Sequence, residues 1–202
     1  MDEPIHVEHG DKVVSITLNR PARRNALSLR LLGALGEALS DSTAGDAGAV
    51  ILAGASLGGA FDIAMSCDLR IASADAFFQV PATRLGLLYN PRSIVRMRRR
   101  LGRDAVFNLL VLGNRLDAGA ALKAGVVSSV VGEGESRAAA LKTVRLAAEN
   151  VGSAVAASKA LLDAIDHGEF GAGHCETVRE AHLSSPERER AVAEAKARLK
   201  DS

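Results

Sequence analysis

The chain has 202 residues, of which 48% are hydrophobic and 24% charged, and its formal net charge is +1. This composition is sufficient for a folded core and excludes wholesale disorder. The small net charge and an aromatic content of 3% give no support to a nucleic acid or an anionic membrane surface as partner.

The sequence favours a protein of the cytoplasm. It contains no apolar run long enough to span a bilayer, and its first residues lack the basic and apolar pattern of a secretory signal. Its two cysteines, Cys67 and Cys175, do not suggest a disulfide framework, which fits a reducing compartment.

The first half of the chain reads as strand–helix units. Alternating β-branched residues predict a strand at 13–18, and Ser28 is the expected N-cap of a helix that runs to about residue 39. The apolar run at 49–53 predicts a buried strand, and a helix is expected over 59–66 after a glycine turn. Two short strands are expected at 69–72 and 77–80.

The chain from residue 91 onward is expected to be almost entirely helical, with one strand at 126–130. The periodic segments that predict helices are 93–101, 104–112, 118–124, 136–149, 153–166 and two pieces within 174–200. We therefore expect an α/β core at 1–132 and a helical C-terminal region at 133–202.

The glycine turn before the helix at 59–66 is the most informative feature. Glycine at a helix start leaves backbone N–H groups bare at the positive end of the helix dipole, where they can stabilise negative charge on an oxygen atom. Residues 54–58 also fit the G-x-S-x-G pattern of a serine hydrolase, with Ser56 as nucleophile. The available histidines lie in predicted helices, which disfavours that alternative.

A wider match favours a different interpretation. Residues 57–72 resemble the signature of the crotonase (enoyl-CoA hydratase/isomerase) family, GGG-x-E/D-L-A-x-x-C-D-x-R-x-A. Further family patterns resemble the sequence, in the same order, at 18–27, 78–86 and 113–127. The resemblance implies a crotonase-like spiral of ββα units followed by a helical region that assembles a homotrimer or a dimer of trimers.

The resemblance also implies an acyl-CoA thioester as substrate, with coenzyme A bound as part of it, no covalently bound cofactor and no metal. Family members belong to fatty acid metabolism and stabilise a thioester enolate between two backbone N–H groups. Gly59 matches the second of these donors. Asn25, Ala26, Gly58 and Lys159 match positions that contact the substrate or its coenzyme A, and so does Arg24, whose side chain could reach a phosphate.

The acid–base residues depart from the family pattern. Asp62 matches the first of the two glutamates that hydratases use, and Ala82 matches the second and cannot transfer a proton. The segment that ends in Tyr89 and Asn90 resembles methylmalonyl-CoA decarboxylases, in which a tyrosine at the position of Tyr89 could orient a carboxylate or protonate an enolate. We therefore expect a lyase or isomerase that is not an efficient two-glutamate hydratase, and a decarboxylase-like activity and an enoyl-CoA hydratase activity both stay open.

About 45 residues that the family carries between the strand at 49–53 and the glycine run have no counterpart near 55–57, more than an ordinary difference in loop length. Either the protein lacks this segment, which would hold the first oxyanion donor, or the sequence omits it. Loss of a donor costs roughly 3–4 kcal/mol of transition-state stabilisation. The alternative to an enzyme is therefore an acyl-CoA binder or assembly subunit without catalytic activity.

Overall fold

The computed structural model describes residues 3–10, 12–23, 25–45, 47–54, 58–169 and 171–200. The chain forms two compact units, Met1–Val144 and Arg145–Ser202. The strands are β1 (Ile5–Gly10), β2 (Val13–Leu18), β3 (Ala49–Ala53), β4 (Ile71–Ser73), β5 (Phe77–Phe78), β6 (Leu116–Asp117) and β7 (Ser129–Val131).

The α-helices are α1 (Leu29–Ala44), α2 (Gly59–Ser66), α3 (Pro91–Arg100), α4 (Arg103–Val106), α5 (Ala118–Lys123), α6 (Ser136–Ala148), α7 (Gly152–His167), α8 (Ala172–Leu183) and α9 (Pro186–Lys200). Two 3₁₀ turns, η1 (Pro21–Arg23) and η2 (Thr83–Leu85), and one π-helical turn, η3 (Phe107–Val111), complete the elements.

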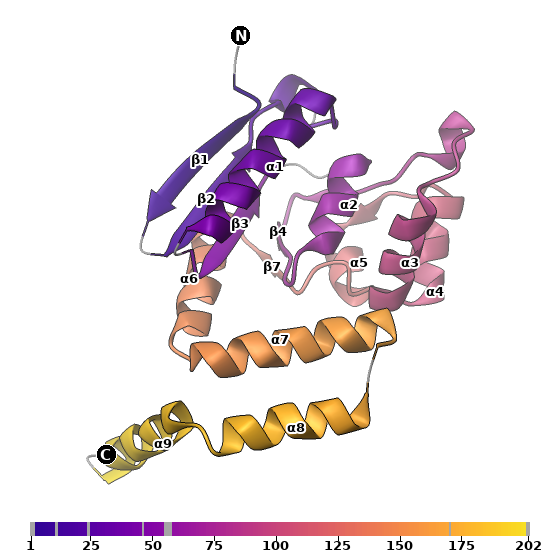
Figure 1. The fold of residues 1–202 in the computed structure, drawn as a ribbon. Coiled ribbons are helices and arrows are strands. Elements are labelled where there is room, and N and C mark those ends of the chain that lie inside the picture. Colours follow the sequence, from indigo (N-terminus) through magenta and orange to yellow (C-terminus); the bar gives the residue numbers. More distant parts are fainter. Residues whose placement is uncertain are drawn as a thin grey trace. The chain divides into compact units, whose positions relative to one another are not determined.

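The first layer of the larger unit is a three-stranded sheet in the order β1-β2-β3 (Figure 1). β1 and β2 form an antiparallel hairpin, and β2 runs parallel to β3 because α1 supplies the crossover between them. Alternate residues of β2 point toward α1, as a period of two requires. The resulting core consists of Ile5, Val14, Ile16, Leu18, Leu31, Leu35 and Ala38.

A second core lies around α2, α3 and the short strands that follow them. β4 pairs in parallel with β7, and β5 pairs antiparallel with β6. Phe61 and Phe78 meet edge to face with ring centroids 6.1 Å apart. The other buried members are Met65, Ala72, Val80, Ala82, Met97, Leu101, Val106, Leu109, Leu110, Ala121, Val126 and Val127.

The strands β3 and β4, on either side of the glycine turn, each have a single hydrogen-bonded neighbour among the described residues. β3 pairs with β2 alone and β4 pairs with β7 alone, so each strand has one edge without a strand partner in the described part of the chain. Unpaired edges present backbone N–H and C=O groups that a further strand could satisfy.

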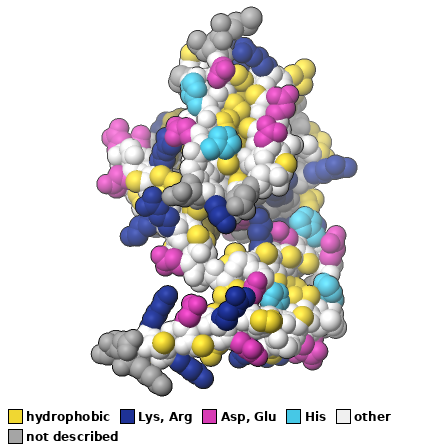
Figure 2. All heavy atoms as spheres, turned by 60° about the vertical axis from the view of Figure 1, so that its left-hand side comes forward, with side chains coloured by type: hydrophobic (Ala, Val, Ile, Leu, Met, Phe, Trp, Pro, Cys, Tyr) yellow, Lys and Arg dark blue, Asp and Glu magenta, His cyan; other side chains and the backbone are white. Residues whose placement is uncertain are grey.

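The smaller unit consists of the end of α6 and the helices α7, α8 and α9. The Ser153 hydroxyl on α7 donates to the Glu187 carboxylate on α9. Within 145–200, no side chain that the structure describes is buried. No helix formed by the described residues is long and apolar enough to cross a membrane. On the face shown in Figure 2, basic and acidic side chains are interspersed, in keeping with the small net charge.

Several predicted elements agree with the structure, including the strands 13–18 and 49–53 and the helix 59–66. The sequence analysis missed β1, in which every residue after Ile5 is exposed. The segment 104–112, predicted as one α-helix, is α4 followed by the π-helical turn η3.

Candidate active site

The glycine turn leads directly into α2. Gly58 has φ +56° and ψ −118°, a conformation that favours glycine, and Gly59 is the first residue of the helix. The Gly58 N–H donates to the Gln79 carbonyl oxygen at 3.3 Å, and the Gly58 carbonyl accepts from the Phe61 N–H at 3.2 Å. No bond from the Gly59 N–H to a residue in the described part of the chain is present, as is usual for the first residue of a helix.

A side-chain contact explains why residue 59 is glycine. A Cβ atom at this position would lie 2.5 Å from Cδ1 and 2.9 Å from Cγ of Leu27, well inside ordinary contact distance. Leu27 packs against the core beneath the first sheet. The missing Cβ of Gly59 therefore makes room for Leu27, a packing role that the sequence analysis did not foresee.

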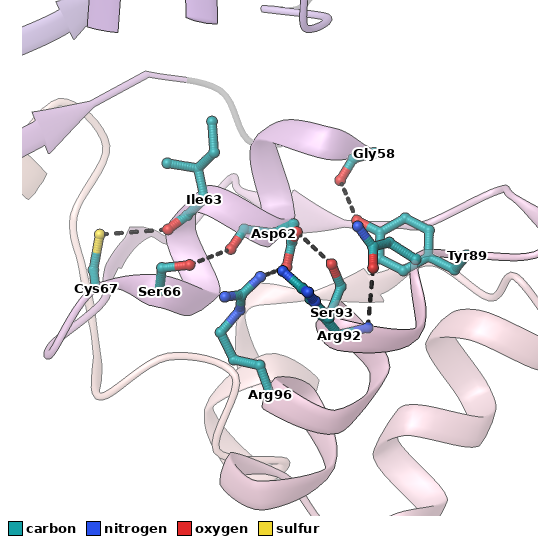
Figure 3. Close-up of polar contacts among 10 residues, drawn as sticks. Gly58, Asp62, Ile63, Ser66, Cys67, Tyr89, Arg92, Ser93 and Arg96 are labelled. Atoms are coloured by element: carbon teal, nitrogen blue, oxygen red, sulfur yellow. Dashed lines mark hydrogen bonds and ion pairs between the residues drawn. The ribbon is translucent and has the colours of Figure 1, made fainter. Parts of the chain in front are cut away.

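The Asp62 carboxylate lies one turn into α2 and is held by two side chains of α3 (Figure 3). Its Oδ2 accepts from the Ser93 hydroxyl at 2.5 Å, and its Oδ1 accepts from Nη2 of Arg96 at 2.9 Å. One carboxylate oxygen thus accepts from a hydroxyl group and the other from a charged guanidinium group. In this arrangement Asp62 ties α3 to α2, and using it as a base would require these bonds to be broken.

Tyr89 lies just before α3, and its hydroxyl points at the glycine turn (Figure 3). The Tyr89 Oη donates to the Gly58 carbonyl oxygen at 3.2 Å. Burial of the phenol, with a further contribution from the negative charge of Asp62, raises the pKa of Tyr89 to about 12, while Arg96 acts in the opposite direction. The hydroxyl therefore keeps its proton throughout the neutral pH range.

Ala82 is 8% exposed and belongs to the second core. Its carbonyl oxygen accepts from the N–H groups of Leu85 and Leu87, which closes the turn η2. The position is thus filled by an apolar methyl group with no capacity for proton transfer.

Some of the residues predicted to contact coenzyme A lie in the described part of the chain, and others lie outside it. Asn25 is buried with φ +56°, and its Oδ1 accepts from the Arg20 N–H at 2.8 Å. The carbonyl oxygen of exposed Ala26 accepts from Nη1 of Arg20 at 2.6 Å. Arg24 and Ser56 lie outside the described residues. Lys159 is on α7, in the smaller unit.

Two site residues escaped the sequence analysis, namely Ser93 and Arg96 of α3. They are three positions apart on one helix, so they share a face, and this spacing was a signal that they could hold one group together. Nothing in the sequence indicated that their common partner would be Asp62, 31 and 34 positions earlier.

The chain is similar to known proteins in both sequence and fold. Residues 52–177, more than half of the chain, match the model of the family described as "Enoyl-CoA hydratase/isomerase". The chain is 26% identical over 187 aligned positions to a probable enoyl-CoA hydratase, echA6, of Mycobacterium bovis, an alignment that covers 71% of this chain and 77% of the relative.

Solved structures show the same fold. The crystal structure of an enoyl-CoA hydratase from Mycobacterium tuberculosis matches 90% of this chain and all of its own with a TM-score of 0.76 and 26% identity. A structure from Geobacillus kaustophilus matches with a TM-score of 0.85 at 19% identity, which concerns the fold alone. The molecule thus has the crotonase-type α/β fold. The chain belongs to the enoyl-CoA hydratase/isomerase family.

Proposed function

We propose that the chain binds an acyl-CoA thioester at the glycine turn and stabilises the enolate of that thioester. The observation that carries this proposal is the Gly59 N–H, which opens α2 and has no acceptor among the described residues. A backbone N–H at a helix N-terminus acts together with the helix dipole on a developing oxyanion. One such donor contributes about 2.7–4 kcal/mol of transition-state stabilisation.

We further propose that the reaction is not hydration by two carboxylates. Two observations support this view. Ala82 is an apolar residue of the core, and Asp62 already accepts bonds from Ser93 and Arg96. Activation of a water molecule requires a base within hydrogen-bond reach, and neither position offers a free one.

Decarboxylation of a malonyl-type thioester fits these residues better, because it needs an enolate stabiliser and little base catalysis. The bond between the α-carbon and the carboxylate breaks, carbon dioxide leaves, and the electron pair moves to the thioester oxygen as an enolate. A proton from water then restores the α-carbon. The Gly59 N–H would stabilise the charge that develops on the thioester oxygen in the first step.

A comparison of Gly59→Pro with Gly59→Ala distinguishes the role of the Gly59 N–H from the packing of residue 59 against Leu27. Both substitutions add a Cβ, but Gly59→Pro also deletes the N–H, and proline is well tolerated at the first position of a helix. Both are to be made in a Leu27→Ala background, which removes the atoms that the Cβ would meet. Turnover of methylmalonyl-CoA and crotonyl-CoA is then measured in each variant.

The proposal predicts that the alanine variant decarboxylates methylmalonyl-CoA and that the proline variant is about 100-fold slower or worse. Equal turnover in the two variants would refute the role of the Gly59 N–H. Rapid hydration of crotonyl-CoA by the unmodified protein, at rates typical of two-glutamate hydratases, would refute the argument from Ala82 and Asp62.

A second candidate function is binding of acyl-CoA without turnover. The alignment with the M. bovis relative has 187 positions but covers only 71% of this chain, or about 143 residues. About 44 positions of the alignment therefore have no residue of this chain. The strand before the glycine turn, β3, and the strand after α2, β4, each have an edge without a strand partner in the described part of the chain. Both observations fit the loss of a segment that would supply the first oxyanion donor. Calorimetry with acetyl-CoA that shows binding, together with no turnover of either substrate, would favour this candidate.

We also infer that the helices of the smaller unit are covered by other copies of the chain, as a homotrimer or a dimer of trimers would do. Large apolar side chains on these helices are exposed, among them Leu162 at 65% and Ile165 at 52%. Light scattering coupled to size-exclusion chromatography tests this proposal, and a monomer at micromolar concentration would contradict it.

A further inference from the structure

The peptide that joins Gly58 to Gly59 is held at its carbonyl end by two donors from different parts of the chain. The Phe61 N–H and the Tyr89 hydroxyl each donate to the Gly58 oxygen, both at 3.2 Å. Figure 3 shows the bond from Tyr89. A trans peptide is planar, and its C=O and N–H groups point in opposite directions. A bond that fixes the carbonyl therefore also fixes the direction of the Gly59 N–H.

This peptide needs such a tie more than most others. It is flanked by glycine on both sides, and glycine backbone torsions are the least restricted of any residue. The Phe61 bond comes from α2 itself and moves with the helix. Tyr89 donates from a separate segment, so its bond restrains the rotation of the peptide relative to the rest of the site.

Tyr89 is itself positioned by α3. The Asn90 side chain caps this helix by accepting from the Arg92 N–H at 3.0 Å. Two turns of the same helix are tied to Asp62 of α2 through Ser93 and Arg96. The tyrosine is thereby fixed to the same helix whose first peptide it holds, and Asp62 acts on the site through this connection.

We infer that Tyr89 is a positioning residue, whose hydroxyl holds the Gly58–Gly59 peptide so that the Gly59 N–H points out of the helix end toward the thioester oxygen. This inference rests on the proposed function of Gly59. It replaces the roles of proton donor or carboxylate ligand that the sequence suggested for Tyr89, because the hydroxyl uses its O–H in a hydrogen bond to the Gly58 carbonyl. A hydrogen bond to the carbonyl also polarises the peptide and makes its N–H a better donor.

The sequence offers an unusually direct test, because Gly58–Gly59 is the only pair of consecutive glycines in the 202 residues. If glycine is labelled with 13C at the carbonyl and 15N at the amide, a spectrum that correlates each amide with the preceding carbonyl contains one signal, from this peptide. Tyr89→Phe is expected to move the Gly58 carbonyl-carbon resonance to lower chemical shift. Leu88→Ala, a neighbouring residue that is 84% exposed, is the matched control and should leave it unchanged.

A second variant keeps the fold and acts in the opposite direction. Tyr89 is the only tyrosine in the chain, so biosynthetic incorporation of 3-fluorotyrosine changes this position alone. The fluorinated phenol is more acidic and a stronger donor, and it should move the Gly58 carbonyl resonance to higher chemical shift. An unchanged resonance in both variants would overturn the inference.

Acetyl-CoA, added to the unmodified protein, tests the proposed function separately. If Gly59 is an oxyanion donor, its amide proton should move downfield on binding, and no movement at saturation would refute the proposed function whatever Tyr89 does. In Tyr89→Phe the downfield movement should shrink, and kcat should fall about tenfold with KM within twofold. A fall in kcat with an unchanged carbonyl resonance would instead identify Tyr89 as a proton donor and overturn the positioning role.

Discussion

The contact between Gly59 and Leu27 allows a quantitative test of the structure. In Gly59→Ala the new Cβ would lie 2.5 Å from Leu27 Cδ1, more than 1 Å inside an optimal carbon–carbon contact of about 3.5–4.0 Å. Leu27 must then leave its place against the first core, and overpacking of this kind costs about 1–3 kcal/mol. Alanine recovers up to about 1 kcal/mol through its lower conformational entropy in the unfolded state. We therefore expect Gly59→Ala to lower the free energy of unfolding by about 1–2 kcal/mol.

The assay is urea denaturation of a double-mutant cycle. Leu27→Ala alone should destabilise the protein because it removes apolar contacts. Adding Gly59→Ala to Leu27→Ala should then cost nothing or stabilise the protein, which gives a favourable coupling energy of about 1–3 kcal/mol between the two sites. Gly36→Ala is the matched control, because nothing lies within 4 Å of a Cβ at that helical position and the substitution should be stabilising. Additive effects of the two substitutions would refute the packing role of Gly59.

Three further predictions concern single groups. The near-UV absorbance titration of the protein reports Tyr89 alone, and its midpoint should lie near pH 12 rather than near 10. Because folding raises the pKa of Tyr89, the free energy of unfolding should fall as the pH rises above about 10, and Tyr89→Phe should lose this dependence. Ser28→Ala removes the side-chain oxygen that accepts from the Leu31 N–H and should lower the free energy of unfolding by about 1 kcal/mol in urea denaturation. The Arg137 guanidinium holds the pKa of the Glu8 carboxyl below its usual 4.5. This pair should therefore stabilise the fold above that pH and lose its effect as the pH falls. In an NMR titration of Arg137→Gln, the Glu8 midpoint should return to its usual value.

Local patterns were sufficient to predict the elements around the glycine turn. The helix over 59–66 follows from the glycines before it and the apolar spacing within it, and the strand before it follows from an unbroken apolar run. The strand β1 could not be found in this way. Five of its six residues are exposed, so it has almost no buried face to signal a strand, and its stability comes from pairing with β2.

The family resemblance selected Gly59 and Tyr89 as candidate site residues, and their roles stay predictions. The bond from Tyr89 to Gly58 and the pairing of Asp62 with Arg96 were not predicted. These contacts join segments about 30 positions apart, which only the packing of α3 against α2 brings together. The sequence specifies which groups exist, but their partners depend on tertiary structure.

The most direct test of the central claim observes the thioester itself. Vibrational spectroscopy of acetyl-CoA labelled with 13C at its carbonyl, bound to the protein at saturation, reports the polarisation of the oxygen atom that Gly59 is proposed to contact. The carbonyl stretch is expected at lower frequency than in free acetyl-CoA, and closer to the free value in the Leu27→Ala/Gly59→Pro variant than in Leu27→Ala/Gly59→Ala. A stretch at the free frequency in the unmodified protein would contradict the claim that the glycine turn stabilises a thioester oxyanion.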